Sequence, residues 1–189
     1  GELLATTGAN RVVNIFDCHG RLVDQVTLAG GSSVSALEWE PGGHVLAVGH
    51  GSAATVTLWN SRSRRVRTLD ISNGCGSRDV TFLQWSRGGD HLAAGTGKGV
   101  LCIYNRRLRT RVWATGKHKR RILCGAWSAH DRLAYASEDR QISICTQTGD
   151  THDQVKVKCK PMDVAFGGRQ RNRDDGVVSV NMEGRTILL

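Results

Sequence analysis

The chain has 189 residues, 39% of them hydrophobic, and a formal net charge of +9, so it can fold around a core of ordinary domain size. No apolar run approaches the roughly 18 residues that a membrane-spanning helix needs, and no stretch has the pattern of a signal or transit peptide. The six cysteines form no C-x-x-C pair, which gives no support to a zinc-ribbon or thioredoxin-like site; Cys102, Cys124 and Cys145 are expected to be buried thiols in a reducing compartment.

Short apolar runs separated by glycine-rich turns predict a series of β-strands along the chain. The first unit, about 1–28, contains a small apolar strand at 4–8, an alternating strand at 13–17 and a more polar strand near 22–28. It is expected to be a partial copy of the repeat that follows.

The complete repeat spans about 34–70 and adds an initial strand that ends in an aromatic residue, Trp39. A Pro-Gly-Gly turn leads to a small apolar strand at 46–49, an alternating strand at 56–60 and a polar strand near 65–69. The outermost strand can be polar because one of its faces meets water. Four antiparallel strands in about 40–45 residues are typical of a WD-repeat blade in a β-propeller.

Further copies occur at about 80–115 and 122–157, followed by a partial copy at about 161–189. Their first strands end in aromatic anchors spaced by 46, 42 and 39 residues: Trp39, Trp85, Trp127 and Phe166. The sequence therefore predicts an all-β fold, a WD40 β-propeller of four-stranded antiparallel blades that is present as an incomplete fragment of about four and a half blades. Seven blades at this period need about 300 residues, so the full-length protein is expected to be larger.

Several repeated residues are interpreted as structural. Most third strands end in an aromatic residue followed by Asp or Asn, and the fourth unit departs from this pattern: Phe16-Asp17, Trp59-Asn60, Tyr104-Asn105 and Cys145-Thr146. Four tryptophans are expected to be core anchors: Trp39, Trp59, Trp85 and Trp127. In WD repeats a histidine and an aspartate placed like His118 and Asp139 join a hydrogen-bond network that fixes the turn between the second and third strands.

Some stretches are more specific than a general WD pattern. They are 16–20, 82–86, 94–99, 103–105, 116–122 with Cys124, Gly125 and Trp127, and 138–139 with 149–151. In this order and spacing they resemble the N-terminal propellers of the one-hundred-forty-four-kilodalton class of WD-repeat subunits in intraflagellar transport complex A. The resemblance covers most of residues 3–157 and weakens after Pro161.

This resemblance implies a protein with tandem N-terminal propellers and a long helical-repeat tail. It implies a hetero-oligomeric complex with other intraflagellar transport A subunits that combine propellers and helical repeats. It further implies a role in retrograde ciliary transport and in the entry of membrane-protein cargo, at the cilium or flagellum, the basal body and the cytoplasm.

A propeller uses its strands for packing, so recognition is expected in its loops. The turns between the third and fourth strands of two adjacent units are rich in arginine and should lie on one face: Arg62, Arg64, Arg65, Arg67, Arg106, Arg107, Arg109 and Arg111. We expect them to form one basic patch for an acidic protein segment or an anionic membrane, although a solvated charged rim has the same composition. A second cluster at 117–121 should face the opposite side, and a third, Arg-rich run lies at 167–176.

The alternatives to this scaffold differ in how the sequence supports them. No motif of a serine hydrolase, zinc protease or nucleotide-binding loop is present, so no enzymatic activity, catalytic residue, cofactor or metal ligand is predicted. An RNA-binding propeller fits the charge, but aromatic residues are few and most serve as anchors, so no specific nucleic acid is predicted. A vesicle-coat subunit or a ubiquitin-ligase substrate receptor could carry the same propeller.

Overall fold

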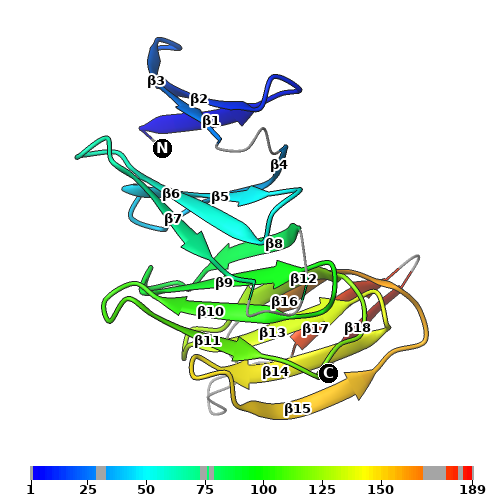
Figure 1. Cartoon of the computed structure of the whole chain (residues 1–189). Helices are drawn as coiled ribbons and strands as arrows, with labels where there is room; N and C mark the ends of the chain where they lie inside the picture. Colours follow the sequence, from blue (N-terminus) through cyan, green and yellow to red (C-terminus); the bar gives the residue numbers. More distant parts are fainter. Residues whose placement is uncertain are drawn as a thin grey trace.

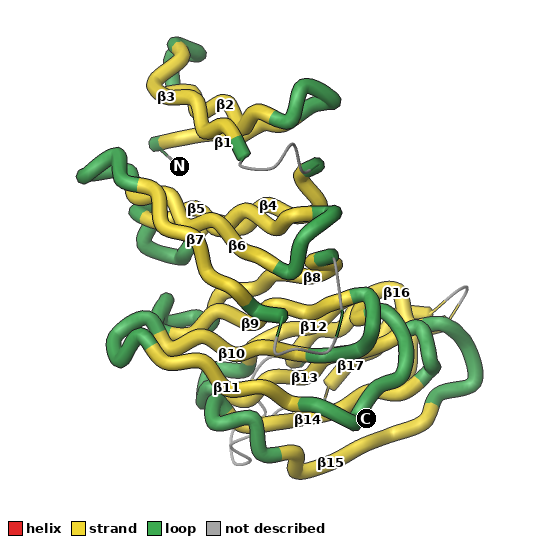
Figure 2. The backbone as a smooth tube through the Cα atoms, in the orientation of Figure 1, coloured by secondary structure: helices red, strands yellow, loops and turns green. Residues whose placement is uncertain are grey.

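The computed structural model describes residues 2–28, 33–72, 76, 79–167, 178–182 and 185–188, and every regular element in them is a β-strand (Figure 2). The strands form five antiparallel sheets, three with four strands and two with three. Each sheet is one blade, and the blades follow one another in chain order to form an open stack (Figure 1). The all-β prediction of four-stranded antiparallel propeller blades is therefore confirmed. The described residues include no helix of the length and apolarity needed to cross a membrane.

The bounds of the strands define the blades. Blade 1 contains β1 (Leu3–Thr7), β2 (Val12–Asp17) and β3 (Leu22–Thr27). Blade 2 contains β4 (Val34–Trp39), β5 (Val45–His50), β6 (Thr55–Asn60) and β7 (Val66–Asp70). Blade 3 contains β8 (Val80–Trp85), β9 (His91–Thr96), β10 (Leu101–Asn105) and β11 (Thr110–Ala114). Blade 4 contains β12 (Ile122–Trp127), β13 (Arg132–Ser137), β14 (Gln141–Thr146) and β15 (Thr151–Lys156), and blade 5 contains β16 (Pro161–Phe166), β17 (Val178–Met182) and β18 (Arg185–Leu188).

The second strand of each complete blade is buried on both faces because it lies between two neighbouring sheets. In β5, Leu46 and Val48 pack toward blade 1, whereas Val45 and Ala47 pack toward blade 3. Side chains alternate between the faces of a strand, so one apolar run supplies two separate cores. This explains why the second strands are buried along almost their whole length, whereas outer strands such as β7 are mostly exposed.

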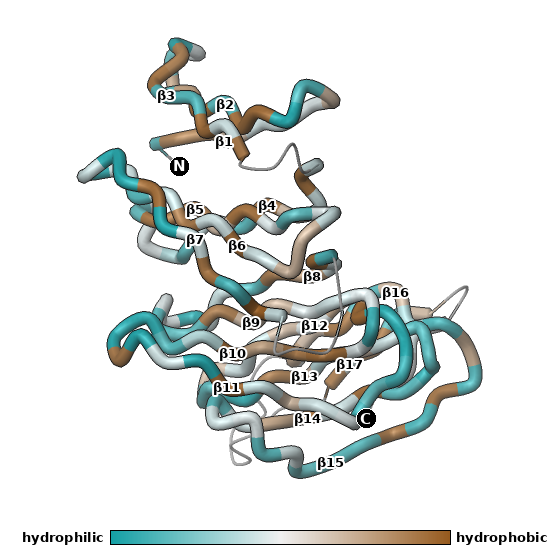
Figure 3. Tube along the Cα trace, in the orientation of Figure 1, coloured by the Kyte–Doolittle hydropathy of each residue, from teal (hydrophilic) through white to brown (hydrophobic). Residues whose placement is uncertain are grey.

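The connections gather on two opposite sides of the stack. The turns that join third to fourth strands, such as β6 to β7 and β10 to β11, lie on one side (left in Figure 1). The connections between blades, such as β11 to β12 and β15 to β16, lie on the other side (right in Figure 1). Both sets are mainly hydrophilic, apart from an apolar tip in the β10–β11 turn (Figure 3). These two sides are the surfaces that the propeller offers to other molecules.

The cysteines in the strands are free thiols that serve as packing residues. Cys102 and Cys145 are buried and Cys124 is half-buried. Burial raises the pKa of each of these thiols to about 12, so they are protonated at neutral pH.

Candidate interaction surface

The arginine rim, which we define as the eight arginines at 62–67 and 106–111, is built on two equivalent turns. The Asn60 side-chain oxygen accepts hydrogen bonds from the backbone N–H groups of Arg62 at 3.1 Å and Ser63 at 2.9 Å. The Asn105 oxygen accepts one from the N–H of Leu108 at 2.9 Å. A short polar side chain after the aromatic residue is needed because it satisfies turn N–H groups that no strand can reach.

Arg64 and Arg109 occupy the same place in these turns, and both have a left-handed backbone, with φ of 54° and 57°. In the corresponding turns of blades 1 and 4 the left-handed residue is a glycine, Gly20 and Gly149. Glycine adopts this conformation freely, whereas a residue with a Cβ atom loses about 1 kcal/mol or more. Two adjacent blades therefore hold an arginine where the backbone alone favours glycine.

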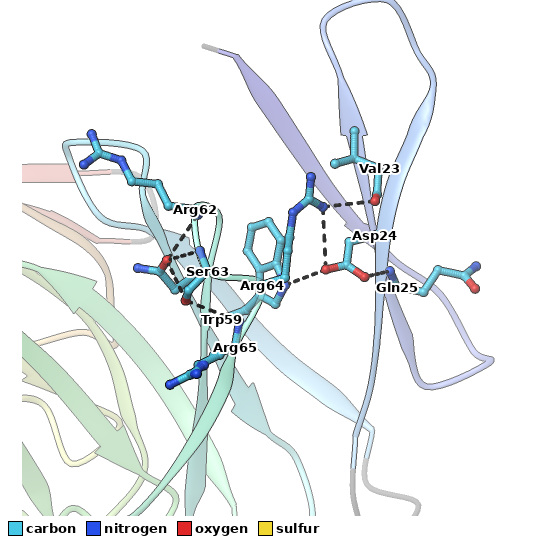
Figure 4. A network of polar contacts seen from close by, with 9 residues as sticks. Val23, Asp24, Gln25, Trp59, Arg62, Ser63, Arg64 and Arg65 are labelled. Carbon is cyan, nitrogen blue, oxygen red and sulfur yellow. Dashed lines mark hydrogen bonds and ion pairs between the residues drawn. The ribbon is translucent and has the colours of Figure 1, made fainter.

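Arg64 joins blade 2 to blade 1 (Figure 4). Its guanidinium lies over the Trp59 ring, 5.6 Å from the centroid, and donates a hydrogen bond to the Val23 carbonyl oxygen at 3.0 Å. It also lies 3.6 Å from Asp24 Oδ2, the atom that accepts a 2.8 Å hydrogen bond from the Trp59 indole. The side chain of Arg64 thus helps to hold two blades together, while 47% of its surface stays exposed.

Arg106 and Arg107 are paired with carboxylates. Arg106 lies 3.1 Å from Glu40 Oε2, so it bridges blade 3 to blade 2, and Glu40 is buried. Arg107 donates to Asp90 Oδ1 at 2.8 Å, but this pair is exposed and is expected to contribute about 0–1 kcal/mol. The two pairs lower the net charge of the rim.

Arg67 and Arg111 were expected in the turns, and this expectation is wrong. They lie in the outer strands β7 and β11, and their side chains reach neighbouring blades. Arg67 donates to the Tyr104 hydroxyl at 3.3 Å, and Arg111 donates to the Asp70 carbonyl oxygen. The sequence places them close to the turns, but the strands begin at residues 66 and 110, before each of them.

The remaining rim arginines have fewer contacts within the chain and are more available to bind another molecule. Arg62 donates to Nε2 of His44 at 3.0 Å. Within the described part of the chain, no hydrogen bond or ion pair is assigned to the side chains of Arg65 and Arg109, and both residues are exposed. Leu108, between the arginines of the second turn, is 72% exposed. The rim therefore presents a few free guanidinium groups and one apolar tip rather than eight equivalent charges.

The tryptophan anchors connect successive first strands. Trp85 and Trp127 are each 4% exposed, and their indole N–H groups donate to Glu38 O at 3.3 Å and Gln84 O at 3.1 Å in the preceding blade. Trp59 is fully buried between blades 1 and 2. Trp39 is only half-buried and packs edge-on against Trp59, because the three described strands of blade 1 offer no first strand opposite it.

His118 and Asp139 are brought together in blade 4. Asp139 Oδ1 accepts a 3.1 Å hydrogen bond from His118 Nδ1, and His118 Nε2 then accepts one from the Ser143 hydroxyl at 3.0 Å. Asp139 also accepts hydrogen bonds from the backbone N–H groups of Lys119 at 3.0 Å and Gln141 at 3.1 Å. The three side chains are linked in the same order, Asp to His to Ser, as in the triad of a serine hydrolase. Ser143 is 0% exposed, however, so its hydroxyl cannot meet a substrate and the network holds the turn and the connection before β12 in place.

A related bond occurs in blade 2, where sequence reasoning did not find it. His50, at the end of β5, is buried and contacts the Thr57 hydroxyl at 2.8 Å through Nε2. Thr57 occupies the same place in β6 that Ser143 occupies in β14, so a hydroxyl at this strand position is the signal that could have revealed the pair.

Acidification is expected to destabilise the propeller through these two histidines. Burial lowers the pKa of His50 below its ordinary value of 6.5, and it does the same for His118, where Asp139 offsets part of the shift. The unfolded chain therefore takes up protons on these rings at a higher pH than the folded chain, so the free energy of unfolding falls as the pH drops below 6.5. We expect the melting temperature to decrease from about pH 7.5 to about pH 5.5. A His50→Gln/His118→Gln variant should show a shallower decrease, and an unchanged slope in that variant would contradict this origin.

The second basic cluster, at 117–121, lies on the opposite side, in the connection from β11 to β12. Arg121 pairs with Asp79 at 3.3 Å, and the backbone of this connection packs closely on Gly99 in the turn between β9 and β10. Exposed cations from other turns join it, which the sequence did not reveal: Lys98, Arg140, Lys158 and Lys160. The third predicted cluster, Arg169, Arg171 and Arg173, lies outside the described residues.

The whole chain, residues 1–189, matches a family model described as WDR19 first beta-propeller. It is 39% identical to WD repeat-containing protein 19 of Homo sapiens over 167 residues. This aligned stretch covers 88% of this chain and 12% of that protein. It is 27% identical to WD repeat-containing protein dyf-2 of Caenorhabditis elegans over 190 residues. This alignment covers 100% of this chain and 14% of that protein. The chain thus spans about an eighth of the length of these relatives.

Proposed function

Because this chain belongs to the WDR19 first beta-propeller family, we propose that it is a non-enzymatic interaction scaffold within a subunit of intraflagellar transport complex A. In this role it supports retrograde ciliary transport and the entry of cargo into the cilium. Its place of action is then the cilium or flagellum with the basal body and the cytoplasm. The observation that carries the proposal is the match of all 189 residues to this family, together with the likeness to WD repeat-containing protein 19.

The geometry supports a scaffold rather than a reaction centre. Both faces of the inner strands are used in packing between blades, so the connections on the two sides of the stack remain for recognition. The buried His118 network holds the backbone of one such connection in place. A rigid blade stack with polar, well-anchored turns is suited to holding other proteins in fixed positions.

We further propose that the arginine rim receives an acidic segment of another subunit of the complex. Arg65, Arg107 and Arg109 are exposed, the last two on either side of Leu108 in the chain, and the planar guanidinium group binds carboxylates through two parallel hydrogen bonds. Rim arginines 64, 67, 106 and 111 hold blades together, so they fix the position of this surface.

Quantitative mass spectrometry of proteins that co-purify with the tagged full-length protein from ciliated cells tests both proposals. We expect the other subunits of complex A in comparable amounts. An Arg65→Glu/Arg109→Glu variant should lose at least one of them, because it reverses two free charges without removing a contact between blades. The matched control is Lys119→Glu/Arg120→Glu, which makes the same charge change on the opposite side.

The outcomes separate the alternatives. Recovery of vesicle-coat or ubiquitin-ligase components in place of complex A would overturn the family-based function while leaving the propeller fold intact. Full recovery of all subunits by the Arg65→Glu/Arg109→Glu variant would remove the arginine rim as their docking surface.

A further inference from the structure

The side of the stack opposite the arginine rim carries a second set of exposed cations. They lie in the turns β9–β10 and β13–β14 and in the connections β11–β12 and β15–β16. We call them the lysine face: Lys98, Lys117, Lys119, Arg120, Arg121, Arg140, Lys158 and Lys160. All eight are exposed, and five of them are lysines.

Contacts between the connections make this face continuous. A Cβ atom at Gly99 would lie 2.6 Å from the His118 carbonyl oxygen, so Lys98 sits directly beside the β11–β12 connection. The backbone N–H of Glu138 donates to Arg121 O at 2.9 Å, which joins that connection to the β13–β14 turn. On the far side of the same turn, Arg140 donates to the Lys158 carbonyl oxygen at 3.4 Å. Four segments from blades 3 and 4 thus meet in one surface.

The charge of this surface is poorly balanced. The described residues of these connections contain two acidic groups, Glu138 and Asp139, and Asp79 of the adjoining β7–β8 connection adds a third, against eight cations, which leaves 8 − 3 = +5. Asp79 pairs with Arg121 and Glu138 pairs with Lys160, both at 3.3 Å. Asp139 is directed inward to His118 and to two backbone N–H groups. Six cations of the face therefore have no acidic side chain assigned to them in the described part of the chain.

The two sides of the propeller differ in the kind of cation they present. The rim has arginines, several of them fixed between blades, whereas the face has mainly lysines at the ends of turns. A lysine ammonium group is a hydrated point charge that does not select the geometry of one carboxylate. Groups of four to eight such cations on one surface are attracted to anionic lipids.

The shape of the surface indicates a planar partner. The turns and connections that carry these cations all leave the same end of neighbouring sheets (right in Figure 1). A bilayer can meet all these tips at once, whereas an extended peptide follows a single line across them. We propose that the lysine face docks the propeller on an anionic lipid bilayer, with the arginine rim turned away from it.

Flotation of the purified full-length protein with lipid vesicles tests this proposal. Vesicles of phosphatidylcholine with phosphatidylserine should bind the protein, vesicles of phosphatidylcholine alone should not, and added salt should weaken the binding. The Lys119→Glu/Arg120→Glu variant should bind about tenfold or more weakly, because two attractive charges become repulsive. Both substitutions leave the blade 4 network in place, since Lys119 contributes only its backbone N–H and Arg120 only its carbonyl oxygen to the bonds assigned there.

The Arg65→Glu/Arg109→Glu variant is the matched control, and it should bind these vesicles as the unmodified protein does. Unchanged vesicle binding by Lys119→Glu/Arg120→Glu, with an unchanged melting temperature, would overturn the proposal. Stronger binding to soluble polyglutamate than to the vesicles, lost in that same variant, would also overturn it and assign the face to an acidic polypeptide. The test needs no other subunit, so its failure is distinct from failure of the proposed function.

Discussion

Replacing Trp85 by alanine is expected to lower the free energy of unfolding by about 3–5 kcal/mol. The indole is 4% exposed in the core between blades 2 and 3, and its removal leaves a cavity that the surrounding strands cannot close. The substitution also deprives the Glu38 carbonyl oxygen of the 3.3 Å hydrogen bond from the indole N–H. Chemical denaturation followed by circular dichroism measures this loss.

Two further variants separate these contributions. Trp85→Phe keeps most of the buried ring but not the N–H group, so we expect it to lose markedly less stability than Trp85→Ala. Leu108→Ala truncates a side chain that is 72% exposed and should change stability by about 0.5 kcal/mol or less. A folded Trp85→Ala variant with the same stability as the unmodified protein would show that Trp85 is not a core anchor.

Replacing Gly99 by alanine is expected to cost about 2–5 kcal/mol, from two sources. Gly99 has φ of 79°, and a left-handed backbone costs a residue with a Cβ atom about 1–2 kcal/mol. The added Cβ atom would also lie 2.6 Å from the His118 carbonyl oxygen and 2.8 Å from that of Arg120. Forcing apart these backbone groups, which the blade 4 network holds in place, adds about 1–3 kcal/mol.

Gly116→Ala is the matched control for this prediction. Gly116 has φ of 74°, but a Cβ atom there would meet no heavy atom within 4 Å. It should therefore show the backbone cost alone, about 1–2 kcal/mol. Equal losses of stability in Gly99→Ala and Gly116→Ala, measured by chemical denaturation, would mean that the close contact between the two connections has no energetic consequence.

Much of the fold could be predicted from the sequence because its signals are local and repeated. The spacing of Trp39, Trp85 and Trp127 predicts the unit, and the period-two alternation in runs such as 56–60 predicts strands. The pattern could not show that β5 serves two cores at once, since an apolar run alone does not say what lies on either side of it. That information comes only from the stacking of the sheets.

The candidate surface was less predictable, for a related reason. Arg67 and Arg111 follow the same arginine-rich runs as Arg65 and Arg109, but they are in strands and their side chains reach other blades. Lys98 and Arg140 were missed because they belong to different repeats from the 117–121 cluster and meet it only through packing between blades. Proximity in the sequence thus overestimates the number of free cations on the rim and underestimates the number of cations on the opposite side.

The division of the interior into separate cores has a thermodynamic consequence. Each of the four cores in the described residues joins two neighbouring sheets. The stack therefore behaves as a linear array in which stability is a sum of terms for single blades and for adjacent pairs. Opening a blade that packs against two neighbours costs the terms for both interfaces as well as the term for the blade itself. Blades 3 and 4, which carry the lysine face, each pack against two described neighbours, so hydrogen exchange of their amides reports the strength of two interfaces at once.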